Sequence, residues 1–142
     1  IKSDVSVDYK VCDLAKLSKK VAKFDLITCL EMLEHVEDPQ AIIALMSHYL
    51  QEDGYIVVST IHRSIISYLK LIVAAEYLLD WIPKGTHQYD YFIKPSELVA
   101  YGRRAQLEMV DIVGVDFVHE SQSFVCTDQV SANYMAVFKK LS

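Results

Sequence analysis

The chain has 142 residues, the length of one domain and enough to bury a hydrophobic core. Its 14 basic and 19 acidic residues give a formal net charge of −5, which argues against a nucleic-acid-binding surface. Cys12, Cys29 and Cys126 form an odd set without the spacing of metal ligands. Because Cys12 and Cys29 lie in apolar, strand-like sequence, we expect both to be reduced core residues, as in a reducing compartment.

The first predicted strand covers residues 5–11, where apolar and polar side chains alternate. Asp13 follows it, and a carboxylate just past a strand end either meets a polar ligand or simply caps a turn. Residues 16–23 are basic and predict an exposed connection. Because the chain starts at Ile1, nearly inside the strand pattern, we expect it to be a fragment or a chain whose beginning is unassigned.

One short stretch concentrates the polar chemistry. Residues 24–30 form a nearly continuous apolar run, which predicts a strand covered on both faces. Glu31, Glu34 and His35 follow, and in a helical turn they would share one face. Ligands bind beyond the carboxyl ends of parallel strands in open α/β sheets, so this cluster is a candidate site. The alternative is a solvated acidic helix start, which the helix dipole favours.

A strand–helix–strand unit is predicted around this stretch. Asp38 and Pro39 mark a helix start, with Asp38 as the cap and Pro39 at the first helical position. Residues 52–54 end this helix, and residues 55–60 are typical of a buried strand. This spacing predicts that the two strands run parallel. The apolar face of the helix comprises Ala41, Ile42, Leu45, Met46, Tyr49 and Leu50.

Residues 65–82 are dominated by large apolar side chains, including Trp81, and fit helical periodicity. Three charged residues interrupt the stretch, which argues against a membrane span. The helix either covers the core or the active site, or it is an interfacial helix that rests on a bilayer. Residues 83–87 break the helix and turn the chain.

The last third of the chain predicts one helix and two strands. Pro95 opens the helix, which runs to about Gln106. Residues 107–118 and 130–138 have strand-like patterns, and residues 120–129 between them form a polar loop. The alternation of strands and helices predicts an α/β fold.

Several motifs in these elements resemble the ubiquinone-biosynthesis O-methyltransferases, class I enzymes that use S-adenosylmethionine. Glu-x-x-Glu-His after a strand is shared by many class I methyltransferases and is only moderately specific. The Ala-Glu-Tyr and Pro-Lys-Gly-Thr-His blocks, in this order and at this spacing, are much more specific. The motifs that carry the resemblance span nearly the whole chain and lie at residues 24–25, 29–36, 75–77, 83–87, 92–98 and 133–135.

The resemblance implies a class I methyltransferase fold, a Rossmann-like, doubly wound α/β sheet that ends in an antiparallel hairpin. In that family the first strand carries a Gly-rich loop for the cofactor, and the second ends in an acid for its ribose. Neither is found here, because all four glycines lie elsewhere. Residues 1–142 would then be a single, N-terminally incomplete methyltransferase domain, the C-terminal two-thirds of the catalytic domain. Residues 62–90 would be an apolar helical insertion and turn that contacts a membrane.

The resemblance also implies the roles of single residues. Leu30 and Asp13 match positions that contact S-adenosylmethionine, and Asp13 would meet the adenine amino group. Glu31, Glu34 and His35 match residues assigned to a divalent cation. Carboxylate oxygens with one imidazole suit a cation such as Mg²⁺.

A metal or a general base can assist methylation of a phenol, because a phenol with a pKa of about 10 is mostly protonated at neutral pH. His35 and His87 are the candidate bases. His87 lies in a turn that could close over the site, or it is simply an exposed loop histidine. Where the family usually has Asn before Arg63, this chain has His62, which leaves any polar role of that Asn open.

The expected activity is S-adenosylmethionine-dependent O-methylation of a polyprenylated catechol or demethylubiquinol in ubiquinone biosynthesis. The expected partners are the polyprenyl phenol or quinol, a membrane surface contacted by residues 65–82, and other quinone-biosynthesis proteins, but no nucleic acid. The expected location is the cytoplasmic face of the bacterial inner membrane or, alternatively, the matrix side of the mitochondrial inner membrane. Without the Gly-rich loop, the isolated chain is expected to bind the cofactor poorly. The alternatives are methylation of another small hydroxylated substrate and a non-catalytic, membrane-associated remnant that acts as a scaffold.

Overall fold

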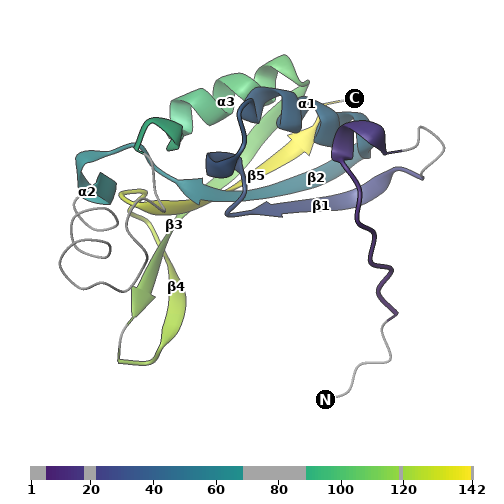
Figure 1. Cartoon of the computed structure of the whole chain (residues 1–142). Helices are drawn as coiled ribbons and strands as arrows, with labels where there is room; N and C mark the ends of the chain where they lie inside the picture. The colour runs from purple at the N-terminus through teal and green to yellow at the C-terminus, as the bar shows by residue number, and fades with distance from the viewer. Residues whose placement is uncertain (1–5, 18–21, 69–88, 119, 142) are drawn as a thin grey trace.

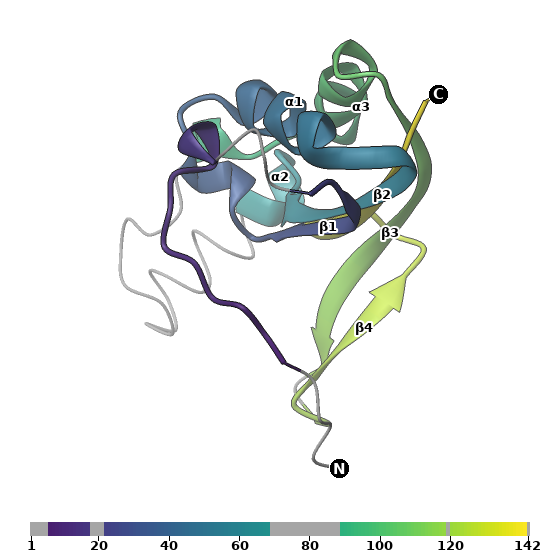
Figure 2. The ribbon, with the colours of Figure 1, turned by 90° about the vertical axis from the view of Figure 1, so that its right-hand side faces the viewer.

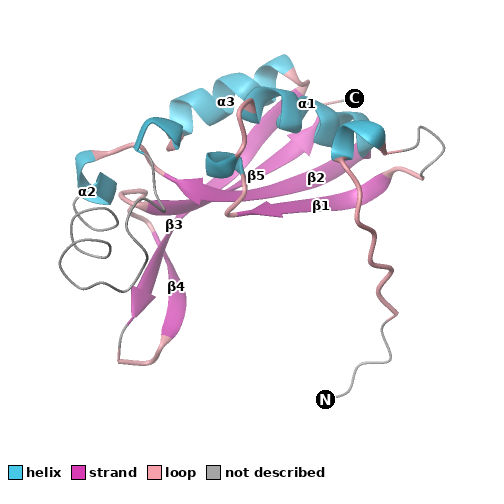
Figure 3. Cartoon of the chain, viewed as in Figure 1, coloured by secondary structure: helices cyan, strands magenta, loops and turns pink. Residues whose placement is uncertain are grey.

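The computed structural model describes residues 6–17, 22–68, 89–118 and 120–141. Its elements, with η for a 3₁₀ helix, are η1 (Leu14–Lys16), β1 (Phe24–Leu30), η2 (Leu33–His35), α1 (Pro39–Tyr49), β2 (Leu50–Ile61), α2 (Ile65–Ser67), η4 (Tyr89–Tyr91), α3 (Pro95–Arg104), β3 (Leu107–Val118), β4 (Ser123–Thr127) and β5 (Asn133–Lys140). Helices α1 and α3 lie over one face of a five-stranded sheet (Figure 1 and Figure 3). The chain is therefore an α/β fold, as predicted.

The sheet has the strand order β1-β2-β5-β3-β4. Strands β1 and β2 run parallel and α1 connects them, which confirms the predicted strand–helix–strand unit. All other neighbouring strands are antiparallel, and β5 lies between β2 and β3. The sheet therefore ends in the antiparallel arrangement that the resemblance implies.

Helix α1 begins where its residues predict. Asp38 Oδ1 accepts a hydrogen bond of 3.0 Å from the backbone N–H of Ala41, and Pro39 is the first helical residue. The helix ends at Tyr49, and β2 starts directly after it, well before the predicted strand start at residue 55. The prediction that Ala41 faces the core is wrong, because it is exposed and Ile43 is buried instead.

Strand β1 lies at the edge of the sheet, and the prediction that both of its faces are covered is wrong. Leu26 and Leu30 are 55% and 52% exposed, and Cys29 is the only buried residue of the strand. Cys29 packs into the core on the face that α1 covers, and none of the described helices lies over the opposite face (Figure 2). The apolar composition predicted the strand but not its place at the edge.

The segment before β1 also differs from its prediction. Residues 6–13 have no regular secondary structure, so the strand predicted at residues 5–11 is not formed in its described part. An alternating pattern makes a stable strand only where neighbouring strands pair with it. Cys12 is exposed and is therefore not the core residue that was predicted, whereas Cys29 is buried.

The C-terminal elements match most of their predictions. Helix α3 starts at Pro95 as predicted, and β3 has the predicted bounds. The loop predicted at residues 120–129 contains a further strand, β4, which pairs with β3. This strand was missed because its apolar run, residues 124–126, is only three residues long and lies between polar residues. Strand β5 starts at Asn133 rather than at Val130.

The helix predicted at residues 65–82 lies mostly outside the described residues. Its first residues form α2, which Ser64 caps by accepting a hydrogen bond of 3.1 Å from the N–H of Ser67. Residues 69–88, with Trp81 and the predicted turn, are not described. Within the described ranges, no helix has both the length and the apolar character needed to cross a membrane.

The core lies between the two long helices and the sheet. Tyr134 and Phe138 of β5 are among its fully buried side chains. Gly102 allows α3 to approach β5 closely, because a Cβ atom at this position would lie 2.4 Å from Cε1 of Phe138. The hydroxyl of Tyr134 donates a hydrogen bond of 3.0 Å to the carbonyl of Ile93, which joins β5 to the segment before α3.

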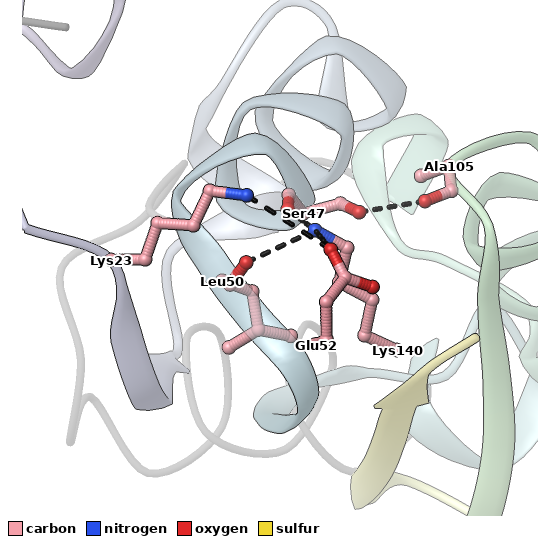
Figure 4. A network of polar contacts seen from close by, with 6 residues as sticks. All are labelled: Lys23, Ser47, Leu50, Glu52, Ala105 and Lys140. Carbon is pink, nitrogen blue, oxygen red and sulfur yellow. Dashed lines mark hydrogen bonds and ion pairs between the residues drawn. The ribbon is translucent and has the colours of Figure 1, made fainter. Parts of the chain in front are cut away.

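A buried lysine joins the end of α1 to the last strand (Figure 4). Nζ of Lys140 donates hydrogen bonds of 3.2 Å and 3.0 Å to the carbonyls of Ser47 and Leu50. It also lies 3.4 Å from Oε1 of Glu52. Carbonyls at a helix end lack partners within the helix, and a cation there suits the negative end of the helix dipole. Ser47 extends the network by donating a hydrogen bond of 2.7 Å to the carbonyl of Ala105.

Replacement of Lys140 by Met should lower the free energy of unfolding by about 1–3 kcal/mol, because two carbonyls and a carboxylate lose a charged donor. The matched control is Lys139→Met on the same strand. Lys139 forms a solvent-accessible ion pair of 2.8 Å with Asp53, so its loss should leave the stability nearly unchanged. Urea denaturation followed by circular dichroism measures both variants. Equal effects of the two substitutions would contradict the role of the network.

The three cysteines should differ in reactivity. Burial first and the charge of Glu34 second raise the pKa of the Cys29 thiol to about 11. Since the thiolate is the reactive species, Cys29 should resist alkylation at about pH 8. Cys12 and Cys126 are exposed. We expect iodoacetamide to label only these two in the native chain and Cys29 as well in urea, as measured by mass spectrometry. Equally fast labelling of Cys29 in the native chain would show that this burial is wrong.

Candidate functional site

The candidate site lies where the carboxyl ends of β1 and β2 meet. Because the two strands are parallel, Leu30 at the end of β1 pairs with Ser59 near the end of β2. The loop that leaves β1 therefore starts beside the last residues of β2. In α/β sheets this is the edge at which ligands bind, and the acidic residues singled out in the sequence lie in this loop.

Glu31 turns the chain as it leaves β1. Its φ of 49° lies in the left-handed region, which costs about 1–2 kcal/mol for a residue with a side chain. Ser59 offsets this cost, because the N–H of Glu31 donates to its carbonyl at 3.1 Å and to its Oγ at 3.0 Å. Oγ of Ser59 in turn donates a hydrogen bond of 2.6 Å to Oε1 of Glu31. One residue of β2 thus holds both the backbone and the side chain of Glu31.

Glu34 is bound by the next residue of β2. It is 5% exposed, and Oγ1 of Thr60 donates a hydrogen bond of 2.7 Å to its Oε2. A buried carboxylate needs such a donor, because burial penalises its charge.

The pKa of Tyr134 is raised, first by burial and then by the charges of Glu97 and Glu34. Tyr134 therefore stays a neutral hydrogen-bond donor at physiological pH.

The three predicted metal ligands are not brought together. Glu34 is buried, whereas Glu31 and His35 are exposed. The helical turn that would gather them does not form, because the left-handed Glu31 lies outside η2 and only residues 33–35 are helical. Within the described part of the chain, no three His, Cys, Asp or Glu side chains are grouped so that they could hold a metal ion. This donor set does not fit Mg²⁺, which needs several oxygen ligands around one point.

The two predicted cofactor contacts are accessible. Leu30 is exposed at the end of β1. Asp13 caps η1, because its Oδ1 accepts a hydrogen bond of 2.9 Å from the N–H of Ala15, and its carboxylate stays open to solvent. The capping role that the sequence left open is thus the one that the structure displays. The second predicted base, His87, lies outside the described residues.

Two residues that the sequence analysis did not single out organise this site. Ser59 and Thr60 lie near the end of β2, and each donates a hydrogen bond to one carboxylate of the loop after β1. The available signal was a pair of hydroxyl residues that closes a buried parallel strand. His62 also has a structural partner, since its Nδ1 lies 2.8 Å from the carbonyl of Val130.

Comparisons with known proteins show the family to which this chain belongs. A family described as a methyltransferase domain matches residues 3–112. The chain is similar to a ubiquinone biosynthesis O-methyltransferase of Pasteurella multocida, with 49% identity over 82% of this chain and 48% of the relative. A relative with the same name from Cupriavidus pinatubonensis is 36% identical over 100% of this chain and 57% of its own length. The chain thus spans about half the length of these curated relatives.

Solved structures show the same fold at low identity. An S-adenosylmethionine-dependent methyltransferase of Thermotoga maritima aligns with a TM-score of 0.63 at 19% identity, over 90% of this chain and 61% of its own. Another from Clostridium acetobutylicum has a TM-score of 0.60 at 17% identity, over 94% of this chain and 64% of its own. The chain has the class I methyltransferase fold and belongs to the methyltransferase-domain family.

Proposed function

We propose that the chain is part of an S-adenosylmethionine-dependent O-methyltransferase of ubiquinone biosynthesis, with a polyprenylated catechol or demethylubiquinol as substrate. The observation that carries this proposal is the identity of 36–49% to relatives of that name over most of this chain. The Ala-Glu-Tyr block at residues 75–77 and the Pro-Lys-Gly-Thr-His block at residues 83–87 support it, because both belong to the pattern of that family.

The residues of the chain have separate tasks in this proposal. When bound, S-adenosylmethionine supplies an electrophilic methyl group on a sulfonium. Leu30 and Asp13 are the proposed contacts to it, because both side chains are exposed, although Oδ2 of Asp13 also lies 3.7 Å from Nζ of Lys16. His35, exposed at the end of η2, accepts the proton that the phenol loses as its oxygen attacks, and His87 is the second candidate for this task. The scheme has no step through Mg²⁺, because Glu31, Glu34 and His35 are not grouped around one point in the described part of the chain.

The proposal is tested in a chimera in which this chain replaces the matching 57% of the Cupriavidus pinatubonensis relative. We expect the purified chimera to methylate a short-chain prenyl catechol with S-adenosylmethionine. His35→Gln should lower its kcat by about 100-fold or more with the cofactor KM unchanged, because the substrate proton loses its acceptor. Liquid chromatography with mass spectrometry measures the methylated product.

The matched control for His35 is His48→Gln, since His48 is an exposed histidine on α1, away from the loop. It should leave kcat unchanged. A folded chimera that methylates another hydroxylated compound but no prenyl catechol would contradict the proposed substrate. A folded chimera that binds no cofactor would instead favour the scaffold role.

We also propose that residues 65–82 contact a membrane, so that the protein is peripheral to the bacterial inner membrane on its cytoplasmic side or, alternatively, to the mitochondrial inner membrane. The support is the apolar sequence of this segment and the lipid character of the proposed substrate. Replacement of Leu71, Leu78 and Trp81 by Glu should abolish co-sedimentation with phosphatidylglycerol-containing vesicles. Acidic substitutions on exposed positions of α1, such as Ala44→Glu, serve as controls. Retained binding of the triple variant would contradict the membrane contact and favour the alternative that the segment covers the core.

A further inference from the structure

The two glutamates of the loop after β1 are each bound by a hydroxyl group of β2. We propose that Glu31 and Glu34 are positioning residues, which together with Ser59 and Thr60 form a clasp that holds the loop without a metal ion. This clasp keeps the imidazole of His35 at the rim of the sheet. The inference rests on the proposed function, since it names how the base of that same site is positioned.

The two side-chain hydrogen bonds of the clasp leave β2 on opposite faces of the sheet. Adjacent residues of a strand point to opposite faces, so Ser59 and Thr60 reach the loop on different sides. Thr60 is fully buried and bonds Glu34, whereas Ser59 bonds the exposed Glu31. The loop is therefore held at two points, one by each of these hydrogen bonds.

This arrangement competes with metal binding. Magnesium holds its oxygen ligands at about 2.0–2.1 Å, so the ligand oxygens must crowd around one point. Oε1 of Glu31 accepts its hydrogen bond from Ser59, and Oε2 of Glu34 accepts its own from Thr60. These two carboxylates bond residues on opposite faces of the strand. To share one cation, the oxygens of Glu31 and Glu34 would have to come together at one point, and the described side chains are not grouped in that way.

The position of His35 depends on η2 and on the two buried residues that precede it. Its backbone N–H donates a hydrogen bond of 3.0 Å to the carbonyl of Met32, which closes η2. The two residues before it, Leu33 and Glu34, are buried, so η2 is fixed against the sheet. The ring of His35 is left exposed at the end of this short helix. Loss of the bond between Thr60 and Glu34 should therefore displace the imidazole while the residue itself stays intact.

Two substitutions at one position separate the hydroxyl from the shape of the side chain. Thr60→Val keeps the shape and removes the donor, whereas Thr60→Ser keeps the donor. In the 142-residue chain, we expect Thr60→Val to lower Tm by about 5 °C and Thr60→Ser to change it much less, because only Val leaves the buried carboxylate of Glu34 without its donor. Differential scanning calorimetry measures both. Equal melting temperatures of the two variants would overturn the clasp.

Magnesium alone is the second probe, again with the 142-residue chain. A ligand that binds the native state raises Tm by mass action, so about 10 mM MgCl₂ should leave Tm unchanged if the loop holds no cation. Isothermal titration calorimetry with MgCl₂ should show no saturable binding. A rise in Tm that Glu34→Gln abolishes would establish a metal site and overturn the inference.

The positioning role is tested in the chimera by measuring kcat and KM separately. It predicts that kcat falls while KM does not change. Per folded molecule, Thr60→Val should lower kcat about tenfold with both KM values unchanged, because a displaced base costs rate rather than binding. Thr60→Ser should restore kcat to within about twofold of the parent. An unchanged kcat in Thr60→Val would overturn the role. An inactive parent chimera would refute the proposed function alone, because melting and magnesium titration still decide whether the clasp exists.

Discussion

The hydrogen bond from Thr60 to Glu34 is the contact on which the loop after β1 depends. It links a buried carboxylate to a strand that lies in the core, and a carboxylate that lost this donor would cost about 1–3 kcal/mol or more. Ser59 adds the second fixed point by holding Glu31 in a left-handed conformation. The parallel pairing of β1 with β2 makes both contacts geometrically possible, since it brings the two strand ends to the same edge of the sheet.

The C-terminal end of α1 is held by a second set of contacts. There the buried Lys140 donates to the carbonyls of Ser47 in the last turn of α1 and of Leu50 directly after it, so this end of the helix is tied to β5 while Asp38 caps its start. The helix that connects the two parallel strands is therefore constrained at both termini. Strand β1, which this helix joins to β2, lies at the edge of the sheet and exposes apolar side chains. Such an edge strand is prone to pair with strands of other molecules.

The parts of the fold that local chemistry determines could be predicted from the sequence. The cap at Asp38, the start of α3 at Pro95 and the strand at residues 107–118 follow from caps, fixed φ values and apolar patterns. The motifs also indicated the methyltransferase family, which the comparisons then showed. The predictions that were wrong concern features that depend on which strands pair with one another in the folded chain. Neither the exposure of Leu26 nor the absence of a strand at residues 6–11 can be read without knowing which strands pair.

The predicted grouping of three metal ligands is absent from the described part of the chain for a related reason. Convergence of the side chains at positions 31, 34 and 35 required a continuous helical turn, and the hydrogen bonds to Ser59 hold Glu31 in a conformation that prevents one. These partners are 28 and 26 residues away along the chain, so no local pattern reveals them. The most direct measurement is a crystal structure of the chain grown with MgCl₂. The account predicts the hydroxyl of Thr60 within hydrogen-bond distance of Glu34 and no cation between the carboxylates, and a magnesium ion bound by Glu31, Glu34 and His35 would contradict it.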